Sequence, residues 1–443
     1  MSNVKNQNIM KYVIPTMLGS VCFFLFTIVD GIFVGHGVGT NGLGAVNLVM
    51  PFVMVVNALF MLATIGGVTI VAIRLGRGDV QGANQAFMHA MSIALLISVA
   101  LSGAGIFFPH QLCALLGARG DFHEMAAEYL FWYSVFIIPS GMSTALQGFC
   151  RNDGDPVLVS VGVILGTALN IFGDWYLIFP KQMGLAGAAI ATGISQTITF
   201  LIVLTHFLRK KGVLRFRRFK TEGSLFRQIA LRSLPECIAQ FATPVTTLWM
   251  NSVLISQIGT IAVNAYSIIS YVASFSVAIF FGTAEGLQPL FGHCYGSEDE
   301  ESLHYYFRAG LIINVLGSIL INVVLLFIGG AVCQLFGADE QTLAFTIKAM
   351  PLYAWGFVIT AFNTMISAYL YSTTRTKQAI IINTLRSFVV NTVVILGLPA
   401  LLGSNIIWHT FGVYESIVLL VAVLLLRQAK KHSSIVSGTG NSV

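Results

Sequence analysis

Long apolar runs separated by short polar segments occupy the sequence from residue 11 to residue 426. An α-helix needs about 20 predominantly apolar residues to cross a bilayer. Runs of that length predict twelve transmembrane helices. The expected spans are 11–35, 46–73, 86–108, 126–148, 157–180, 184–208, 233–258, 262–291, 307–333, 345–371, 379–402 and 405–426. The runs are continuous rather than alternating, which excludes a transmembrane β-barrel.

The composition supports the same class. Of the 443 residues, 56% are hydrophobic and only 9% are charged, whereas a soluble domain carries about 25% charged residues. So few charges could not cover the surface of a soluble protein of this length, and the high hydrophobicity excludes disorder. We therefore predict an all-α integral membrane protein. The first apolar run is too long for the core of a signal peptide, so it is expected to remain as the first span.

Lys and Arg residues gather in alternate loops and predict the orientation. The segment after the sixth span begins RKKGVLRFRRFK, and residues 209–232 hold nine basic side chains. Placing this linker in the cytoplasm puts both termini inside and gives twenty basic residues inside against three outside, at Arg119, Lys181 and Lys348. The net charge of +6 then reflects topology in a cell membrane rather than a nucleic-acid partner.

The two halves of the chain resemble each other at a spacing of about 220 residues. Cys113-Ala-Leu-Leu-Gly-Ala118 recurs as Cys333-Gln-Leu-Phe-Gly-Ala338, and Gly39-Thr40 recurs as Gly259-Thr260. Further matches in the same order are Ala45-Val46-Asn47 with Ala262-Val263-Asn264, Tyr133 with Tyr353, and Asn170 with Asn391. The consistent order indicates an internal duplication.

Each repeat contains six helices, an even number, so both copies share one orientation and their pseudo-two-fold axis follows the membrane normal. The expected domains are an N-terminal lobe (1–208), a basic cytoplasmic linker (209–232), a C-terminal lobe (233–426) and a cytoplasmic tail (427–443). Two facing lobes leave a central cleft, which rocking motions would open to each side in turn. The alternative is a duplicated scaffold without transport.

Carboxylates at bilayer depth cost at least about 2.5–3.5 kcal/mol, so they mark functional candidates. The five such positions are Asp30, Asp174, Glu236, Glu285 and Glu415.

Asp30 and Asp174 lie about five and six residues from the outer ends of helices one and five, so they share a depth in the first lobe. Asn170 is one turn below Asp174 on the same face. Thr192 in helix six is expected at that level, and Gln147 at the end of helix four nearer the cytoplasm. Two carboxylates with amide and hydroxyl oxygens could hold a proton or Na⁺. The alternative is a structural hydrogen-bond cluster.

The remaining carboxylates are assigned differently. Glu285 lies in the inner part of helix eight, before Gln288 and Pro289, where it could meet a cationic substrate or snorkel to the interface. Glu236 is interpreted as an interfacial cap. Glu415 and Arg386 are expected to form a compensated structural pair.

No phosphate-binding loop or nucleotide domain is present in the sequence, so energy is expected from an ion or substrate gradient, without a cofactor. The six cysteines have no metal-ligand spacing and are interpreted as small core residues.

These motifs resemble the multidrug and toxic compound extrusion (MATE) family over essentially all twelve spans. The likeness is carried by the sequence Thr-Ile-Val-Asp-Gly around Asp30, by Gln147-Gly148-Phe149 followed by Arg151 and Gly154, by Asn170 with Asp174, by Gly184-Leu-Ala-Gly-Ala-Ala189, and by Gly286-Leu-Gln-Pro-Leu290. The sequence is similar to the MepA-like or DinF-like branches. It departs from the NorM-like pattern, because segments 240–245 and 360–364 lack a carboxylate, which favours coupling in the first lobe.

The resemblance implies a cation-coupled exporter of two six-helix lobes. Residues matching Asp30, Asp174, Asn170 and Thr192 form the family's first-lobe ion site, and Pro15 matches a first-helix proline that some mechanisms bend on protonation. We expect a monomeric antiporter in the bilayer that expels amphipathic, cationic small molecules in exchange for H⁺ or Na⁺.

One alternative is a lipid-linked oligosaccharide flippase, which would need a strongly basic cavity. Another is a membrane enzyme, which would need a nucleophile–base pair or a metal triad at common depth.

Overall fold

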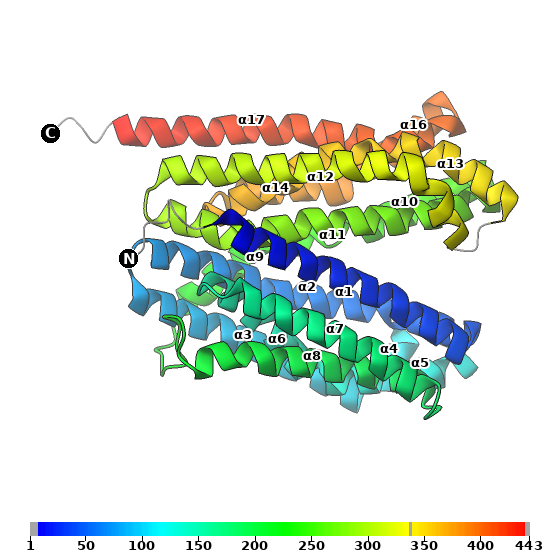
Figure 1. Cartoon of the computed structure of the whole chain (residues 1–443), viewed down its shortest axis with the longest axis horizontal. Coiled ribbons are helices and arrows are strands. Elements are labelled where there is room, and N and C mark those ends of the chain that lie inside the picture. The colour runs from blue at the N-terminus through cyan, green and yellow to red at the C-terminus, as the bar shows by residue number, and fades with distance from the viewer. Residues whose placement is uncertain (1–7, 336–338, 439–443) are drawn as a thin grey trace. The chain divides into compact units, whose positions relative to one another are not determined.

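The structure is a computed structural model that describes residues 8–335 and 339–438, and every regular element in these ranges is a helix. Figure 1 labels these helices in chain order. The all-α membrane fold predicted from the sequence is confirmed. Ten helical segments are long and apolar enough to cross a membrane, and broken helices cover the fourth and seventh expected spans.

The chain divides into two compact units, one formed by Met1–Ser233 with Gly292–Asp299 and the other by Leu234–Phe291 with Glu300–Val443. The helices up to the basic segment are α1 (Ile9–Gly37), α2 (Thr40–Gly76), α3 (Val80–Phe107), α4 (Pro109–Leu115), α5 (Asp121–Val135), α6 (Ile137–Asn152), α7 (Pro156–Ile178) and α8 (Gly184–Leu208). Within the first unit α7 packs between α1 and α8 (Figure 1).

The later helices are α9 (Gly223–Ala239), α10 (Ala242–Gln257), α11 (Thr260–Gly296), α12 (Glu300–Leu335), α13 (Glu340–Ala354), α14 (Gly356–Ser372), α15 (Thr376–Thr384), the π-helix η2 (Leu385–Val389), α16 (Val390–Leu402), the 3₁₀-helix η3 (Ser404–His409) and α17 (Thr410–Gly438). Several begin earlier than the apolar runs do. Helix α9 starts at Gly223, ten residues before the expected seventh span, so the end of the basic linker is itself helical.

The backbone repeats the duplication seen in the sequence. Residues in the left-handed region recur at the same spacing of about 220: Gly39 with Gly259, Gly78 with Glu298, and Gly154 with Thr374. Each pair ends or begins equivalent helices in the two halves. Glycine adopts positive φ without steric cost, whereas Glu298 and Thr374 carry a side chain there. The turn geometry was therefore retained where the glycine was not.

The fourth and tenth spans are broken at equivalent residues. Phe136 separates α5 from α6, and Trp355 separates α13 from α14. Each ring packs on a glycine of a later helix, Phe136 on Gly193 and Trp355 on Gly412, so closely that a Cβ at either glycine would overlap the ring. The interruption and the aromatic contact that accompanies it are thus both duplicated.

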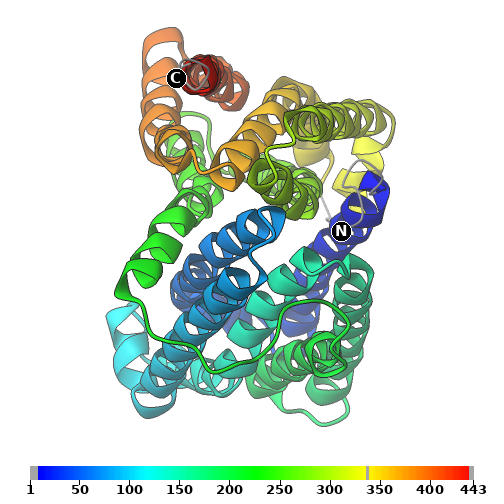
Figure 2. The same ribbon diagram turned by 90° about the vertical axis from the view of Figure 1, so that its left-hand side faces the viewer.

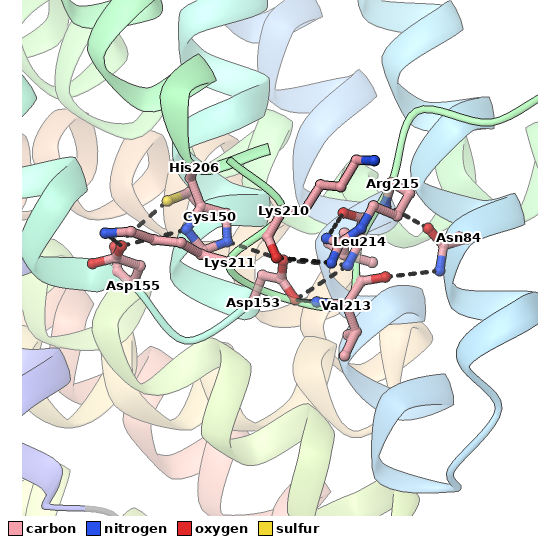
Figure 3. A network of polar contacts seen from close by, with 10 residues as sticks. All are labelled: Asn84, Cys150, Asp153, Asp155, His206, Lys210, Lys211, Val213, Leu214 and Arg215. Atoms are coloured by element: carbon pink, nitrogen blue, oxygen red, sulfur yellow. Dashed lines mark hydrogen bonds and ion pairs between the residues drawn. The ribbon is translucent and has the colours of Figure 1, made fainter. Parts of the chain in front are cut away.

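The basic segment after α8 packs against the first unit. Figure 2 shows it crossing the ends of the helices between α8 and α9. The amide of Val213 donates to Asp153 Oδ1 at 2.8 Å, and the amide of Arg215 donates to Asn84 Oδ1 at 2.6 Å. Farther along, the amide of Glu222 donates to Nε2 of His89 at 2.9 Å. Figure 3 shows the contacts of Val213 and Arg215 as part of a polar network around Asp153 and His206.

The six cysteines all lie among the described residues and are free thiols, five of them buried. This agrees with their interpretation as core residues. The second copy of the repeated cysteine motif ends at Phe336-Gly337-Ala338, which lies outside the described residues.

Candidate functional site

The first candidate site joins two carboxyl groups from neighbouring helices. Asp30 lies near the C-terminal end of α1 and Asp174 near that of α7, and these helices pack along each other in the first unit. The two carboxyl groups lie close enough to interact electrostatically. Two ionised carboxylates at short range repel each other, and a proton on either one removes that repulsion. The pair is therefore a candidate for binding H⁺ or another small cation.

Few hydrogen-bond donors surround the carboxyl groups of Asp30 and Asp174. Asp174 is fully buried. Among the described residues, no N–H or O–H group forms a regular hydrogen bond with either Asp174 oxygen or with Oδ1 of Asp30. A buried carboxylate without donors or a counter-ion is strongly disfavoured in its charged form. Such oxygens are satisfied by a bound proton or by a small cation.

Asn170 and Thr192 complete the oxygen-rich cluster that the sequence predicts. Asn170 lies one turn before Asp174 on α7 and is fully buried. Its Nδ2 donates to Oγ1 of Thr192 on α8 at 3.2 Å, while its Oδ1 has no donor among the described residues. The hydrogen bond fixes the amide so that a carbonyl oxygen remains available beside Asp174. Carboxylate, carbonyl and hydroxyl oxygens are the ligands that hard cations prefer.

Sequence reasoning missed Tyr129, which α5 places within electrostatic range of both aspartates. Tyr129 is 6% exposed and its ring lies parallel to that of Tyr133, with centroids 6.4 Å apart. The only signal in the sequence is the spacing of Tyr129 and Tyr133, one helical turn apart in the expected fourth span. A phenol next to two carboxyl groups can donate a hydrogen bond to either of them.

Two other first-lobe candidates lie apart from these contacts. Gln147 on α6 donates to Ser143 of its own helix at 3.1 Å, so this hydrogen bond is local to the helix. Pro15 lies inside α1, about four turns before Asp30. A proline in a helix interior removes one backbone hydrogen bond and permits a kink. Both residues are where the sequence predicts them, and their roles stay predictions.

In the second unit, the structure corrects the interpretation of Glu236. The sequence suggested an interfacial cap, but α9 begins at Gly223 and Glu236 is buried at 6% exposure within its last turns. Glu285 on α11 lies within electrostatic range of Glu236, and both are near Tyr371 of α14. Gln288, one turn after Glu285, is 3% exposed. Glu236 and Gln288 are therefore buried, whereas Glu285 is only partly buried.

The predicted pair between Arg386 and Glu415 is confirmed. Nε of Arg386 donates to Oε1 of Glu415 at 2.7 Å, and Glu415 is 1% exposed. Nδ2 of Asn363 donates to Oε2 of the same carboxylate at 2.7 Å. Arg386 lies in the π-helix η2, whose extra residue per turn displaces its side chain from the regular α-helical position. The buried ion pair is thus hydrogen-bonded on both carboxylate oxygens.

Comparison with known proteins identifies the family of the chain. The MatE family profile matches residues 15–176 and 235–396, once in each half of the chain. The multidrug export protein MepA of Staphylococcus saprophyticus is 25% identical over 429 residues, covering 95% of this chain and 93% of that protein. MepA of Staphylococcus haemolyticus is 25% identical over 363 residues, with 79% of each chain covered.

Solved structures share the fold. An outward-facing multidrug resistance MATE transporter of the MOP superfamily has a TM-score of 0.90 at 23% identity, with 95% of each chain covered. A MATE structure in a bent conformation has a TM-score of 0.87 at 22% identity, covering 98% of this chain and 96% of that one. The two family matches begin at residues 15 and 235, which is the spacing at which the sequence motifs and the left-handed turns recur.

Proposed function

The chain belongs to the MatE family of multidrug efflux transporters, and we propose that it is a secondary antiporter that expels amphipathic, cationic compounds in exchange for H⁺ or Na⁺. The transport proceeds by alternating access of two six-helix lobes, in a cell membrane with both chain termini in the cytoplasm. The observation that carries the proposal is the proximity of Asp30 and Asp174 on neighbouring helices: Asp174 is fully buried, and both of its oxygens and Oδ1 of Asp30 lack a hydrogen-bond donor among the described residues.

The coupling step follows from the electrostatics of that pair. With neither carboxyl protonated, two negative charges share a region with few donors, which is unfavourable. A proton or Na⁺ entering from outside removes that repulsion and draws α1 and α7 together. Asn170 and Thr192 hold an oxygen in place beside Asp174 for the incoming cation. The energy released in this step is available to change the conformation of the first lobe.

The return step requires the opposite change. When the lobe opens inward, the lower concentration of the ion in the cytoplasm favours its release. Proline has no backbone N–H, so α1 already lacks one helical hydrogen bond at Pro15. The helix can therefore bend at this position without losing a further one. Ion occupancy and the shape of α1 are in this way linked by one helix, so ion binding and substrate binding exclude each other.

The substrate class rests on charge and on the relatives. The curated relatives are multidrug export proteins. In the second unit the carboxyl groups of Glu236, which is buried, and of Glu285, which is partly buried, can attract a positively charged group, and Gln288 adds a hydrogen-bonding amide. We expect organic cations with an apolar body to bind best.

The test is dye efflux from proteoliposomes, with a pH gradient and a Na⁺ gradient imposed separately. Asp30→Asn and Asp174→Asn are each expected to reduce gradient-driven efflux at least tenfold while the purified protein stays folded. Glu128→Gln, which changes an exposed carboxylate on α5, serves as the matched control and is expected to retain efflux. Full gradient-driven efflux by Asp30→Asn would overturn the proposal, and the gradient that drives efflux by the wild type identifies the ion.

A further inference from the structure

Three potential metal ligands meet at a corner between two helices of the first unit. His110 is the second residue of α4, and His123 and Glu124 lie in the first turn of α5. The chain reverses between the helices through Gly117 and Gly120, which have φ values of +95° and +60°. Both glycines adopt a conformation that other residues rarely take. This turn brings His110 close to His123 and Glu124, which lie thirteen and fourteen residues later in the chain.

The donor atoms of the three side chains converge. One nitrogen from each imidazole and one carboxylate oxygen all lie within 4.8 Å of one another. Nδ1 of His110 is 3.8 Å from Oε1 of Glu124. The imidazole rings of His110 and His123 stack with their centroids 5.4 Å apart and an angle of 23° between their planes. Stacked imidazoles beside a carboxylate form a compact set of ligands on one side of a shared space.

We propose that His110, His123 and Glu124 form a binding site for a divalent transition-metal ion of the Zn²⁺ class. Two imidazole nitrogens and one carboxylate oxygen are a ligand set that Zn²⁺ uses, at about 2.0–2.2 Å from each donor. The present separations require only small side-chain rotations to reach that geometry. Water supplies the remaining position. Ca²⁺ and Mg²⁺ prefer all-oxygen sites, so this site discriminates against them.

The surroundings of His123 favour metal binding through one particular nitrogen. Its Nδ1 lies 3.4 Å from the carbonyl oxygen of Ala118, in the turn between the helices. A ring that donates from Nδ1 to a carbonyl presents an unprotonated Nε2 to a metal, an arrangement common among histidine ligands. His110 and Glu124 are 56% and 78% exposed, so an ion reaches the site from solvent.

This site lies outside the ion-coupling cluster but on an element that contributes to it. Helix α5 carries Glu124 in its first turn and Tyr129, within electrostatic range of the two aspartates, in its third. A bound ion cross-links α4 to the outer end of α5 and restrains the turn at Gly117 and Gly120. Because a metal bound only by the folded state stabilises that state, binding raises the thermal unfolding midpoint.

The experiment uses the purified full-length chain in detergent, with any polyhistidine tag removed. We expect Zn²⁺ to raise the unfolding midpoint and to bind at about one ion per chain in a calorimetric titration, whereas Mg²⁺ and Ca²⁺ have no effect. His110→Ala and Glu124→Gln are expected to weaken Zn²⁺ binding at least tenfold and to leave the metal-free midpoint unchanged. The matched controls His36→Ala and Glu128→Gln alter exposed residues outside the cluster and should bind Zn²⁺ as the wild type does.

A further variant separates ligation from a structural role. His123→Cys replaces a nitrogen ligand by a thiolate, which soft metals prefer, so Cd²⁺ binding is expected to strengthen relative to Ni²⁺. Equal Zn²⁺ affinity in wild type, His110→Ala and Glu124→Gln would overturn the proposal, as would no Zn²⁺ binding by the wild type. These measurements need no transport, so their result is independent of the proposed antiport.

Discussion

Nε2 of His206 lies 3.0 Å from Oδ2 of Asp153, and the two side chains are only 2% and 1% exposed. Nδ1 of the same ring lies 3.3 Å from Oδ2 of Asp155. Carboxylates only accept hydrogen bonds, so the ring donates from both nitrogens. Asp153 also accepts the amide of Val213. The cluster fastens the basic segment after α8 to the turn after α6 (Figure 3).

The first prediction concerns that attachment. Asp153→Asn is expected to destabilise the first unit by about 3–5 kcal/mol, the usual cost of removing one partner of a buried charged pair. Trypsin should then cut the segment after α8, which contains Lys210, Lys211 and Arg215, much faster than in the wild type. Asp155→Asn leaves the Val213 contact in place and is the control, with a smaller effect. Unchanged trypsin sensitivity of Asp153→Asn would contradict the attachment.

A second prediction addresses the hydrogen bond between Asn170 and Thr192. Thr192→Val keeps the shape of the side chain but removes the acceptor, leaving a buried amide donor unpaired at a cost of about 1–3 kcal/mol. We expect weaker ion coupling, measured as a lower efflux rate at equal gradient, together with a lower thermal midpoint. Thr192→Ser retains the hydroxyl and should preserve coupling. Equal loss in both variants would point to packing rather than to the hydroxyl.

The ion pair of Arg386 and Glu415 leads to a third prediction. Glu415→Gln leaves the buried guanidinium without a counter-charge and should cost about 3–5 kcal/mol, whereas replacing both residues by apolar ones of similar size should be far less harmful. Thermal unfolding and efflux of Glu415→Gln and of the double variant Arg386→Met/Glu415→Leu measure this. A double variant that is stable and transports establishes a structural pair. A stable but inactive one would assign the pair to transport.

The fourth prediction uses the duplicated left-handed turns. Glu298 occupies a position with φ of +58°, where a non-glycine residue costs roughly 1 kcal/mol. Glu298→Gly is therefore expected to raise the free energy of unfolding by about that amount. Gly78→Ala, at the equivalent turn of the first half, should lower it similarly. Chemical denaturation of the two variants compares them directly, and destabilisation by Glu298→Gly would show that its side chain outweighs the strain.

Much of the architecture follows from the sequence alone, because the length and the apolar character that a membrane requires of each helix can be read along the chain. A span must be about 20 apolar residues long, and an uncompensated carboxylate inside it is costly, so the spans and the acidic candidates can be counted along the chain. Repeated motifs such as Gly39-Thr40 and Gly259-Thr260 likewise indicate the duplication. The pairing of Arg386 with Glu415 could be predicted since each needs compensation within the bilayer.

Other features depended on the packing of helices. Tyr129 became part of the site only because α5 packs beside α8, and Glu236 was recognised as buried only once α9 was seen to begin at Gly223. The basic segment after α8 carries a topology signal in its composition, but its attachment to Asp153 and Asn84 needs partners more than sixty residues away.

The sequence by itself determined the membrane class, the expected spans and the repeat, and it predicted a shared depth for Asp30 and Asp174, because hydrophobicity, charge and helical rise act along the chain. Only the tertiary structure decided that the two carboxyl groups lie close together, that both oxygens of Asp174 and Oδ1 of Asp30 lack donors among the described residues, and that His110 meets His123 and Glu124. Those relationships depend on the rotation of each helix and the path of each turn, which many long-range contacts fix together.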